Sequence, residues 1–327
     1  MLKIKSVIYS ILLILSISLS AISGVFAAWN TTADSSVDVK YTVPLYMDGP
    51  TTFKNNINTL AGSTTITKIV FDYYTEENIA IIENATGSVS LGQNGLDTIM
   101  AYAVPNDSGN TIYILSSSLI YAGSSCDGMF NGFTSVKTIE FNNFDTRDTT
   151  NMNGMFLRCS ALTTIDLSRF KTNKVTSIYQ MFRGCSSLTS IDISHFEFDN
   201  VLKDSRAVFD GCNAITSIKL PKKVMRFSGT IRLWFMDCHN LTTIDISCFD
   251  ITNVTETQYM FTRCSKLKTI YVGSGWSTAK VTNSTSMFTS CSSLVGGNGT
   301  KYNSSYVDAA YARVDTPETP GYLTLAN

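Results

Sequence analysis

The sequence predicts a repeat solenoid, with one short parallel β-strand in each repeat of 26–27 residues and a β-rich cap at its N-terminal end. One observation is a phenylalanine that recurs at this interval, and another is a cysteine three residues after six of these seven positions. The phenylalanines are Phe130, Phe156, Phe182, Phe209, Phe235, Phe261 and Phe288. A third observation is a short stretch of alternating apolar and polar residues that follows in most repeats. No single repeat can bury its apolar side alone, so stacking must supply the stability.

The chain begins with a segment typical of exported proteins. Lys3 and Lys5 precede an apolar run from Val7 to Phe26, and Ala27 follows as a small residue suited to cleavage. This pattern predicts a signal peptide over residues 1–27. The alternative is an uncleaved anchor, since about 20 apolar residues can span a bilayer. A secreted or cell-surface location is therefore expected, with membrane contact only through this segment if it stays attached.

Residues 28–125 lack the repeat and are expected to form the N-terminal cap. β-branched and aromatic residues predict strands over 66–74, 88–92, 98–104 and 111–116, with a hairpin loop over 105–110. Such a cap would shield the apolar end of the first repeat. A separate adhesive head is the alternative, but no linker separates this region from Cys126.

The repeats themselves are expected over residues 126–297, in about seven copies, with a C-terminal cap over 298–327. In Thr164–Ser168, Ile165 and Leu167 alternate with polar residues, as in a half-buried strand. Alignment of the repeats assigns the same apolar columns to the core throughout. The predicted core includes Phe156, Cys159, Leu162, Ile165, Leu167, Phe182, Cys185, Leu188, Ile191, Phe261 and Cys264.

One repeat departs from the others. Ile218-Lys219-Leu220-Pro221 places a lysine where other repeats carry aspartate and a proline where they carry serine. Proline has no N–H to donate to a strand ladder. The sequence therefore predicts a kink or a break of the ladder near the middle of the repeats.

The repeat pattern resembles a known family. Met155-Phe156, Cys159, Leu162, Ile165-Asp166-Leu167-Ser168 and Phe170 follow the spacing found in the BspA-like leucine-rich repeat surface proteins of bacteria. The pattern recurs from Met181 to Phe196 and, more loosely, from Trp234 to Phe249, and the resemblance covers about residues 126–322. It implies a leucine-rich-repeat-like right-handed coil in a secreted or surface-displayed protein. Members of this family are associated with adhesion to host matrix proteins or to other cells.

Eight cysteines in an exported chain raise the question of disulfides. The six periodic cysteines share one inward column, where they are expected to be buried thiols; parallel side chains suit a disulfide poorly, and a row of metal ligands is a further alternative. Cys126 and Cys248 stand outside the column. Cys248 aligns with exposed positions and is the best candidate for a reactive thiol, unless it is an inert surface cysteine.

Composition and motifs exclude several classes of function. The net charge of −1 does not provide the basic field that nucleic-acid binding requires. His195 and His239 have no second histidine at ligand spacing, and no nucleophile elbow, P-loop or metalloprotease motif is present. We therefore expect no catalytic residue, no metal site and no cofactor. A hydrolase would require a convergent polar pocket.

The outward positions of the predicted strands offer the best candidate ligand face. It combines carboxylates with hydroxyl groups, and its residues are Glu140, Asp166, Asp192, Asp245, Thr164, Ser190 and Thr243. Lys219 and Tyr271 interrupt the acidic column. Such a face could bind a basic protein segment, a glycan or a cation, or it could serve only to keep the sheet soluble.

These observations predict a secreted or cell-surface repeat protein that mediates protein–protein or cell–host adhesion without catalysis. The expected partner is a macromolecule of unknown identity, such as a host extracellular matrix protein or a surface protein of a neighbouring cell, and not a nucleic acid. A non-adhesive surface scaffold is the alternative, ahead of a glycan-binding module or a hydrolase.

Overall fold

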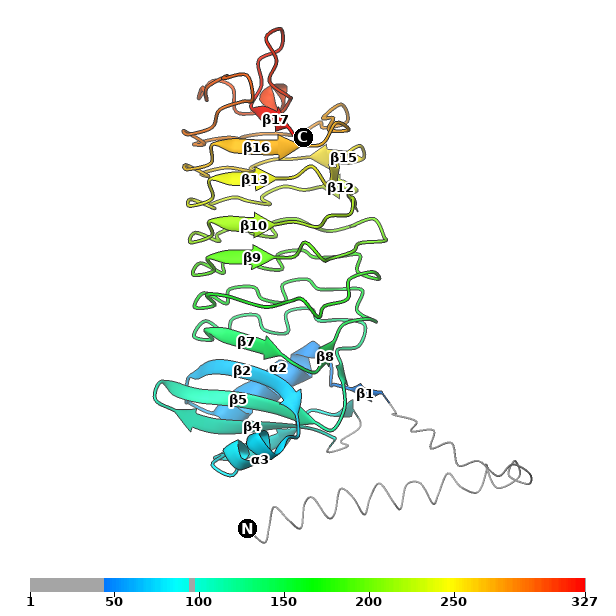
Figure 1. Ribbon diagram of the computed structural model, residues 1–327, viewed down its shortest axis with the longest axis vertical. Coiled ribbons are helices and arrows are strands. Elements are labelled where there is room, and N and C mark those ends of the chain that lie inside the picture. The colour runs from blue at the N-terminus through cyan, green and yellow to red at the C-terminus, as the bar shows by residue number, and fades with distance from the viewer. Residues whose placement is uncertain (1–43, 94–97, 327) are drawn as a thin grey trace, which may run out of the picture. The chain divides into compact units, whose positions relative to one another are not determined.

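The computed structural model describes residues 44–93 and 98–326, so the predicted signal peptide at residues 1–27 lies outside the described residues. The chain from Pro44 onward forms one compact unit (Figure 1). Within the described ranges, neither the length nor the hydropathy of any helix reaches what a membrane-crossing helix needs.

The region before the repeats is built on a mixed sheet of five strands in the order β3-β4-β5-β2-β7. The hairpin of β4 and β5 is antiparallel, whereas β2 pairs in parallel with β5 and with β7. The four strands predicted here are present, but the turn between β4 and β5 covers only residues 107–108, so it is shorter than the loop predicted over 105–110. Their bounds are β2 Ile66–Tyr73, β3 Gly87–Ser90, β4 Ile99–Asn106 and β5 Gly109–Ser116, while β7 is Thr138–Phe141 of the first repeat.

Two helices in this region show that the description as a β-rich cap is incomplete. Helix α2 (Pro50–Ala61) begins with proline at its first position and buries Phe53, Ile57 and Ala61, which are four residues apart. Helix α3 (Glu76–Ile82) is capped by the Thr75 side chain, which accepts a hydrogen bond from the Asn78 N–H at 3.1 Å. Both signals are present in the sequence and were overlooked beside the stronger strand pattern.

The repeats do not form the expected leucine-rich-repeat-like right-handed coil with one parallel strand per repeat, and that prediction is wrong. The short strands instead belong to several small, separate sheets, and Thr164–Ser168 of the second repeat forms no strand. These sheets are β9 (Ser190–Asp192) with β10 (Ser217–Lys219), β11 (Met225–Arg226) with β14 (Phe249–Asp250), β12 (Gly229–Thr230) with β15 (Val254–Glu256), β13 (Thr243–Asp245) with β16 (Thr269–Val272) and β17 (Leu323–Leu325), and β1 (Leu45–Tyr46) with β6 (Ile120–Tyr121) and β8 (Phe144–Asp145).

The row of strands along the repeats is interrupted at two places, namely at Ile165 and Asp166 and after β10. No backbone hydrogen bond joins Ile165 or Asp166 to the neighbouring repeats among the described residues. Pro221 follows β10 closely, and β10 forms no ladder with β13, so the break predicted near Pro221 is confirmed. A continuous sheet along the repeats therefore does not form.

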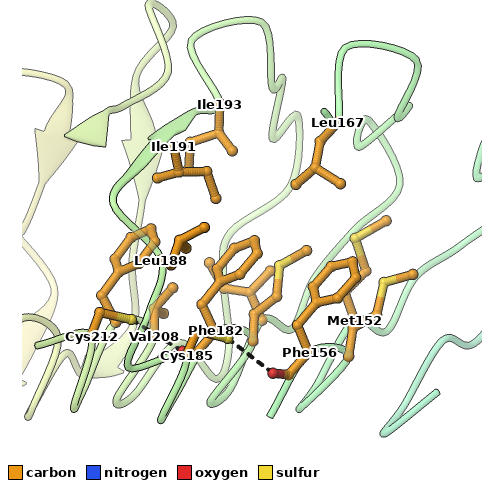
Figure 2. Packing of buried hydrophobic residues seen from close by; sticks show 14 of the residues in the cluster. Met152, Phe156, Leu167, Phe182, Cys185, Leu188, Ile191, Ile193, Val208 and Cys212 are labelled. Carbon is orange, nitrogen blue, oxygen red and sulfur yellow. Dashed lines mark hydrogen bonds between the residues drawn. The ribbon is translucent and has the colours of Figure 1, made fainter. Parts of the chain in front are cut away.

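Turn-to-turn hydrogen bonds and side-chain stacking hold successive repeats together (Figure 1). The Phe156 N–H donates to the Met181 carbonyl at 2.9 Å, and the Phe182 N–H donates to the Val208 carbonyl at the same distance. The rings of Phe156 and Phe182 stack (Figure 2), with centroids 5.3 Å apart, and those of Phe182 and Phe209 lie 5.4 Å apart. The phenylalanine column is thus the central row of the core.

Each phenylalanine of the column lies between two residues of left-handed backbone conformation, two positions before and two positions after it. Around Phe182 these are Gln180 with φ 56° and Gly184 with φ 73°. Around Phe235 neither is glycine, since Leu233 has φ 64° and Asp237 has φ 62°. This pair of turns aims the ring inward, and the variable residues at these positions concealed it from sequence reading.

Most predicted core residues are buried. Phe156, Cys159, Leu162, Phe182, Cys185 and Leu188 have no exposed surface, and Leu167, Ile191, Phe261 and Cys264 are at most 4% exposed. Ile165 is the exception, because it is only partly buried and packs against the rim of the core. Its segment forms no strand, so its side chain has no tight neighbouring ladder to cover it.

Candidate interaction face

The candidate face follows the strand side of the repeats, but the structure divides it. Asp192, Asp245 and Asp166 are exposed, and Glu140 on β7 is half-exposed. Asp192 belongs to the β9–β10 sheet, Asp245 to the β13–β16–β17 sheet, and Asp166 to the segment without a strand. Thr164, Ser190 and Thr243 are exposed beside them. The structure therefore brings Glu140 and Asp166 together and leaves Asp245 in a separate sheet.

The repeated aspartates have a structural task that the sequence analysis missed. The Asp166 Oδ1 accepts a hydrogen bond from the Ser168 N–H at 2.8 Å, and Asp245 accepts one from the Ser247 N–H at 2.8 Å. Asp192 accepts from the Ser194 N–H at 3.0 Å. Each side chain therefore closes an Asx turn two residues ahead, which explains why aspartate recurs. The D-x-S spacing was the signal that could have revealed it.

Two of the carboxylates on the face are paired with lysine. The Lys68 Nζ lies 2.6 Å from Glu140, and the Lys219 Nζ lies 2.9 Å from Asp192. Lys219 thus pairs with one carboxylate of the acidic column rather than merely interrupting the column. Hydrogen bonds from Ser194, and then the Lys219 ammonium, hold the pKa of Asp192 well below its usual range.

Asp166 differs from these two carboxylates. In the part of the chain that the structure describes, no lysine or arginine forms an ion pair with it. Hydrogen bonding from Ser168 lowers the pKa of Asp166, with smaller contributions from the charges of His195 and Arg169. The side chain is therefore an ionised, solvent-facing acceptor at neutral pH.

An open hollow of about 250 Å³ lies at this point of the face. It is lined by β7 with Asn142 and by the segment from Thr164 to Arg169, including Glu140 and Asp166. Because Ile165 and Asp166 form no backbone ladder with the adjacent repeats, the hollow lies where the sheet is interrupted. Sequence reasoning found both carboxylates but did not predict the hollow.

The six periodic cysteines are free and fully buried, and their thiols donate hydrogen bonds to the preceding repeat. The Cys185 Sγ donates to the Phe156 carbonyl at 3.1 Å (Figure 2), and the Cys159 Sγ donates to the Phe130 carbonyl at 3.1 Å. The same contact recurs at Cys212, Cys238, Cys264 and Cys291. This column therefore links repeats by S–H···O bonds.

Cys248 does not have the exposed position that its alignment suggested. It is half-buried and packs against the edge of the core. Burial, with a smaller effect from the charge of Asp245, raises its pKa to about 12. A thiol with such a pKa is a poor nucleophile near neutral pH, which favours the inert cysteine over the reactive thiol.

We expect the native chain to react very slowly with an aromatic disulfide reagent at about pH 8, because a rise in pKa from 9.0 to about 12 lowers the thiolate fraction about a thousandfold. All eight thiols should react rapidly after unfolding in denaturant. Absorbance of the released thiol measures both rates. One equivalent of fast reaction in the native chain, abolished by Cys248→Ser, would contradict this assignment of Cys248.

Stacked repeats with an exposed polar face place the chain in the class of tandem-repeat proteins. Residues 124–222 and 223–315 each match the family described as "Mycoplasma protein of unknown function, DUF285". The two matches follow one another and cover more than half of the sequence, so the chain belongs to this family. The border between them lies beside the interruption between β10 and β13. Searches for similar curated proteins and for similar solved structures give no significant match.

Proposed function

We propose that the chain is a BspA-like surface protein, secreted or displayed at the cell surface, that mediates adhesion by binding a macromolecular partner through the candidate face. The expected partner is a matrix protein of a host or a surface protein of a neighbouring cell. The tandem family matches and the repeat motif around Phe156 and Cys159 support the surface-protein part of the proposal.

The observation that carries the binding part is the hollow beside Asp166. Repeat proteins use extended surfaces formed by equivalent positions of successive repeats to bind other macromolecules. Here Glu140, Asp166 and Asp192 come from successive repeats, and an open hollow lies between two of these repeats. Asp166 keeps an ionised carboxylate without an ion-pair partner among the described residues. A macromolecular partner could satisfy it with hydrogen-bond donors.

A structural surface scaffold is the second candidate. The Asx turns of Asp166, Asp192 and Asp245 favour the scaffold. These turns give the aspartates a structural role, and that role requires no ligand. The two functions differ in whether the carboxylate charges, as distinct from the turns, contribute to binding.

A charge-removing double substitution separates these functions. In the full-length chain, Asp166→Asn/Asp192→Asn keeps an oxygen that can accept the turn hydrogen bond but removes both charges. We expect affinity for a matrix protein or cell-surface protein found on an array to fall about tenfold or more, or about 1.4 kcal/mol. Surface plasmon resonance measures the change.

The matched control is Asp250→Asn. The Asp250 carboxylate makes the same kind of turn, accepting from the Thr252 N–H at 3.1 Å, but it lies on β14 away from the face. This variant should bind as the unsubstituted chain does. Equal affinity of all three proteins would refute a role of the acidic face, and absence of any bound protein would favour the scaffold.

A further inference from the structure

A second open hollow of about 290 Å³ adjoins the hollow beside Asp166. It lies between β2 and helix α3 and is lined by Asp72, Asn78 and Tyr113, together with Lys68 and Glu140. Glu140 lines both hollows. The candidate face is thus continuous with a depression on the sheet that precedes the repeats.

Two polar pairs join the linings of the hollows. The Lys68 Nζ lies 2.6 Å from Glu140 Oε1, and the Asn142 Nδ2 donates to Asp72 Oδ2 at 2.9 Å. Asn142 lines the first hollow and Asp72 lines the second. The hollows therefore form one groove with a low polar ridge across it, hereafter the junction groove.

The hydrogen-bonding groups of the junction groove are numerous and of both kinds. Thr138, Thr164 and Ser168 offer hydroxyl groups, Asn142 offers an amide, and Asp166 offers carboxylate oxygens. Backbone groups of Ile165 and Asp166 add donors and acceptors, since among the described residues no backbone bond joins them to the adjacent repeats. Of the apolar side chains in the lining, Val70, Ile139 and Phe141 are at most 5% exposed, so an apolar ligand would find little surface to bury.

The groove carries a moderate negative charge. Lys68 pairs with Glu140, and the Arg169 charge acts on Asp166 from the same hollow. With Asp72 and Glu77, the lining has four carboxylates and two cationic side chains. This charge disfavours a polyanion, and the carboxylates offer acceptors to hydroxyl groups as well as to cations.

From these features we propose that the junction groove binds a neutral glycan chain carried by a surface or matrix glycoprotein. Vicinal hydroxyl groups of a sugar both donate and accept, which suits carboxylates, amides and backbone groups placed side by side. The Tyr113 side chain lines the second hollow and offers an apolar ring surface beside a polar tip. The proposal rests on the proposed adhesive function, because it names the ligand class of one end of the same face.

The probe is a panel of neutral oligosaccharides of glucose, galactose, mannose and N-acetylglucosamine, titrated into the full-length chain and followed by saturation-transfer NMR. Sialylated and sulfated oligosaccharides and a lysine-rich peptide form the charged arms. We expect millimolar or tighter binding of at least one neutral member, little dependence on salt, and no binding of the charged arms.

A tryptophan at position 164 should fill the groove, because the exposed Thr164 lines the first hollow. We expect Thr164→Trp to weaken binding by about tenfold or more. Ser217→Trp is the matched control, since Ser217 is exposed at the equivalent position of another repeat, lines neither hollow and is not one of the residues of the candidate face. It should leave binding unchanged, and a glycoprotein stripped of its glycans should lose binding to the unsubstituted chain.

The outcomes of the two proposals are distinguishable. If no neutral oligosaccharide binds, or if the two tryptophan variants behave alike, the glycan proposal is wrong. A matrix protein that still binds in an Asp166- and Asp192-dependent manner would then leave the adhesive function standing. Binding of the lysine-rich peptide or of the anionic glycans in preference to the neutral ones would also overturn the proposal.

Discussion

Replacing Phe182 with alanine is expected to lower the free energy of unfolding by about 3–5 kcal/mol. The Phe182 ring has no exposed surface and stacks between Phe156 and Phe209, with centroid distances of 5.3 and 5.4 Å. Alanine leaves a cavity that the fixed backbone on either side cannot close. Chemical denaturation followed by circular dichroism measures the loss.

The position of Phe182 in the column makes this substitution informative. Each repeat is stabilised mainly by its immediate neighbours, so a cavity in the middle weakens two interfaces at once. Phe182→Leu retains most of the buried volume and should cost clearly less. Tyr259→Ala, at a side chain that is 40% exposed, should change stability by less than about 0.5 kcal/mol. If Phe182→Ala unfolded at the same denaturant concentration as the unsubstituted chain, the stacked column would not be the core.

The core could be read from the sequence because burial imposes a period. Phe182, Cys185 and Leu188 each recur at the same offset in successive repeats, and each is fully buried. The period fixes which side chains point inward, but it does not fix how closely adjacent backbones approach. That distance depends on turns such as those at Gln180 and Leu233, whose left-handed conformation leaves no consistent residue type.

The predicted pattern of strands was wrong because the repeat period does not fix the distance between adjacent backbones. Thr164–Ser168 has the same strand alternation as Ser190–Ser194 and Thr243–Ser247, yet it forms no strand, whereas those two segments contain β9 and β13. Alternation reports only which side chains are buried, whereas a strand also requires a partner backbone at hydrogen-bonding distance. The break after β10 was predicted from Pro221, and it does lie beside this residue. The N–H groups at the aligned serines close Asx turns within their own repeats, so the missing N–H of Pro221 removes such a turn rather than a ladder bond.

The candidate site was predictable only in part. The column of Asp166 and Asp192 follows from the repeat, but the Lys68–Glu140 pair joins the first repeat to a strand outside the repeats, and no period connects them. The junction groove likewise lies where the first repeats meet the region that precedes them. Features formed between a repeat and a non-repeated region depend on tertiary packing that spacing alone does not encode.

Replacing Asp315 with alanine is expected to destabilise the C-terminal end of the repeats by roughly 2–4 kcal/mol, because four donors lose a charged acceptor. The buried carboxylate accepts from the Asn298 N–H at 2.8 Å, the Thr300 N–H at 3.0 Å, the Thr300 hydroxyl at 2.6 Å and the Gly321 N–H at 3.1 Å. It thereby ties the loop at Asn298 to the chain that leads into β17 (Leu323–Leu325). Hydrogen exchange of the Leu323 amide reports the loss locally.

The effect should depend on pH. Burial alone would raise the pKa of Asp315, but the hydrogen bonds from Thr300, Gly321 and Asn298 outweigh it and hold the pKa below its usual value. A lowered pKa means that this stabilisation is complete above the unfolded pKa of about 3.9 and is lost as the pH falls through the folded pKa. The difference between Asp315→Ala and the unsubstituted chain should therefore be constant near neutral pH and shrink below about pH 4.

Asparagine substitutions test whether the charge itself is required at Asp315. Asp315→Asn can satisfy only one of the two pairs of donors and turns its own N–H groups toward the other, so it should be nearly as unstable as alanine. Asp308→Asn is the matched control in the same region, because its exposed side chain accepts only from the Ala310 N–H at 2.9 Å, a bond that asparagine can keep. If Asp315→Asn matched the unsubstituted chain in Leu323 exchange at neutral pH, the carboxylate would not be what holds this end of the repeats closed.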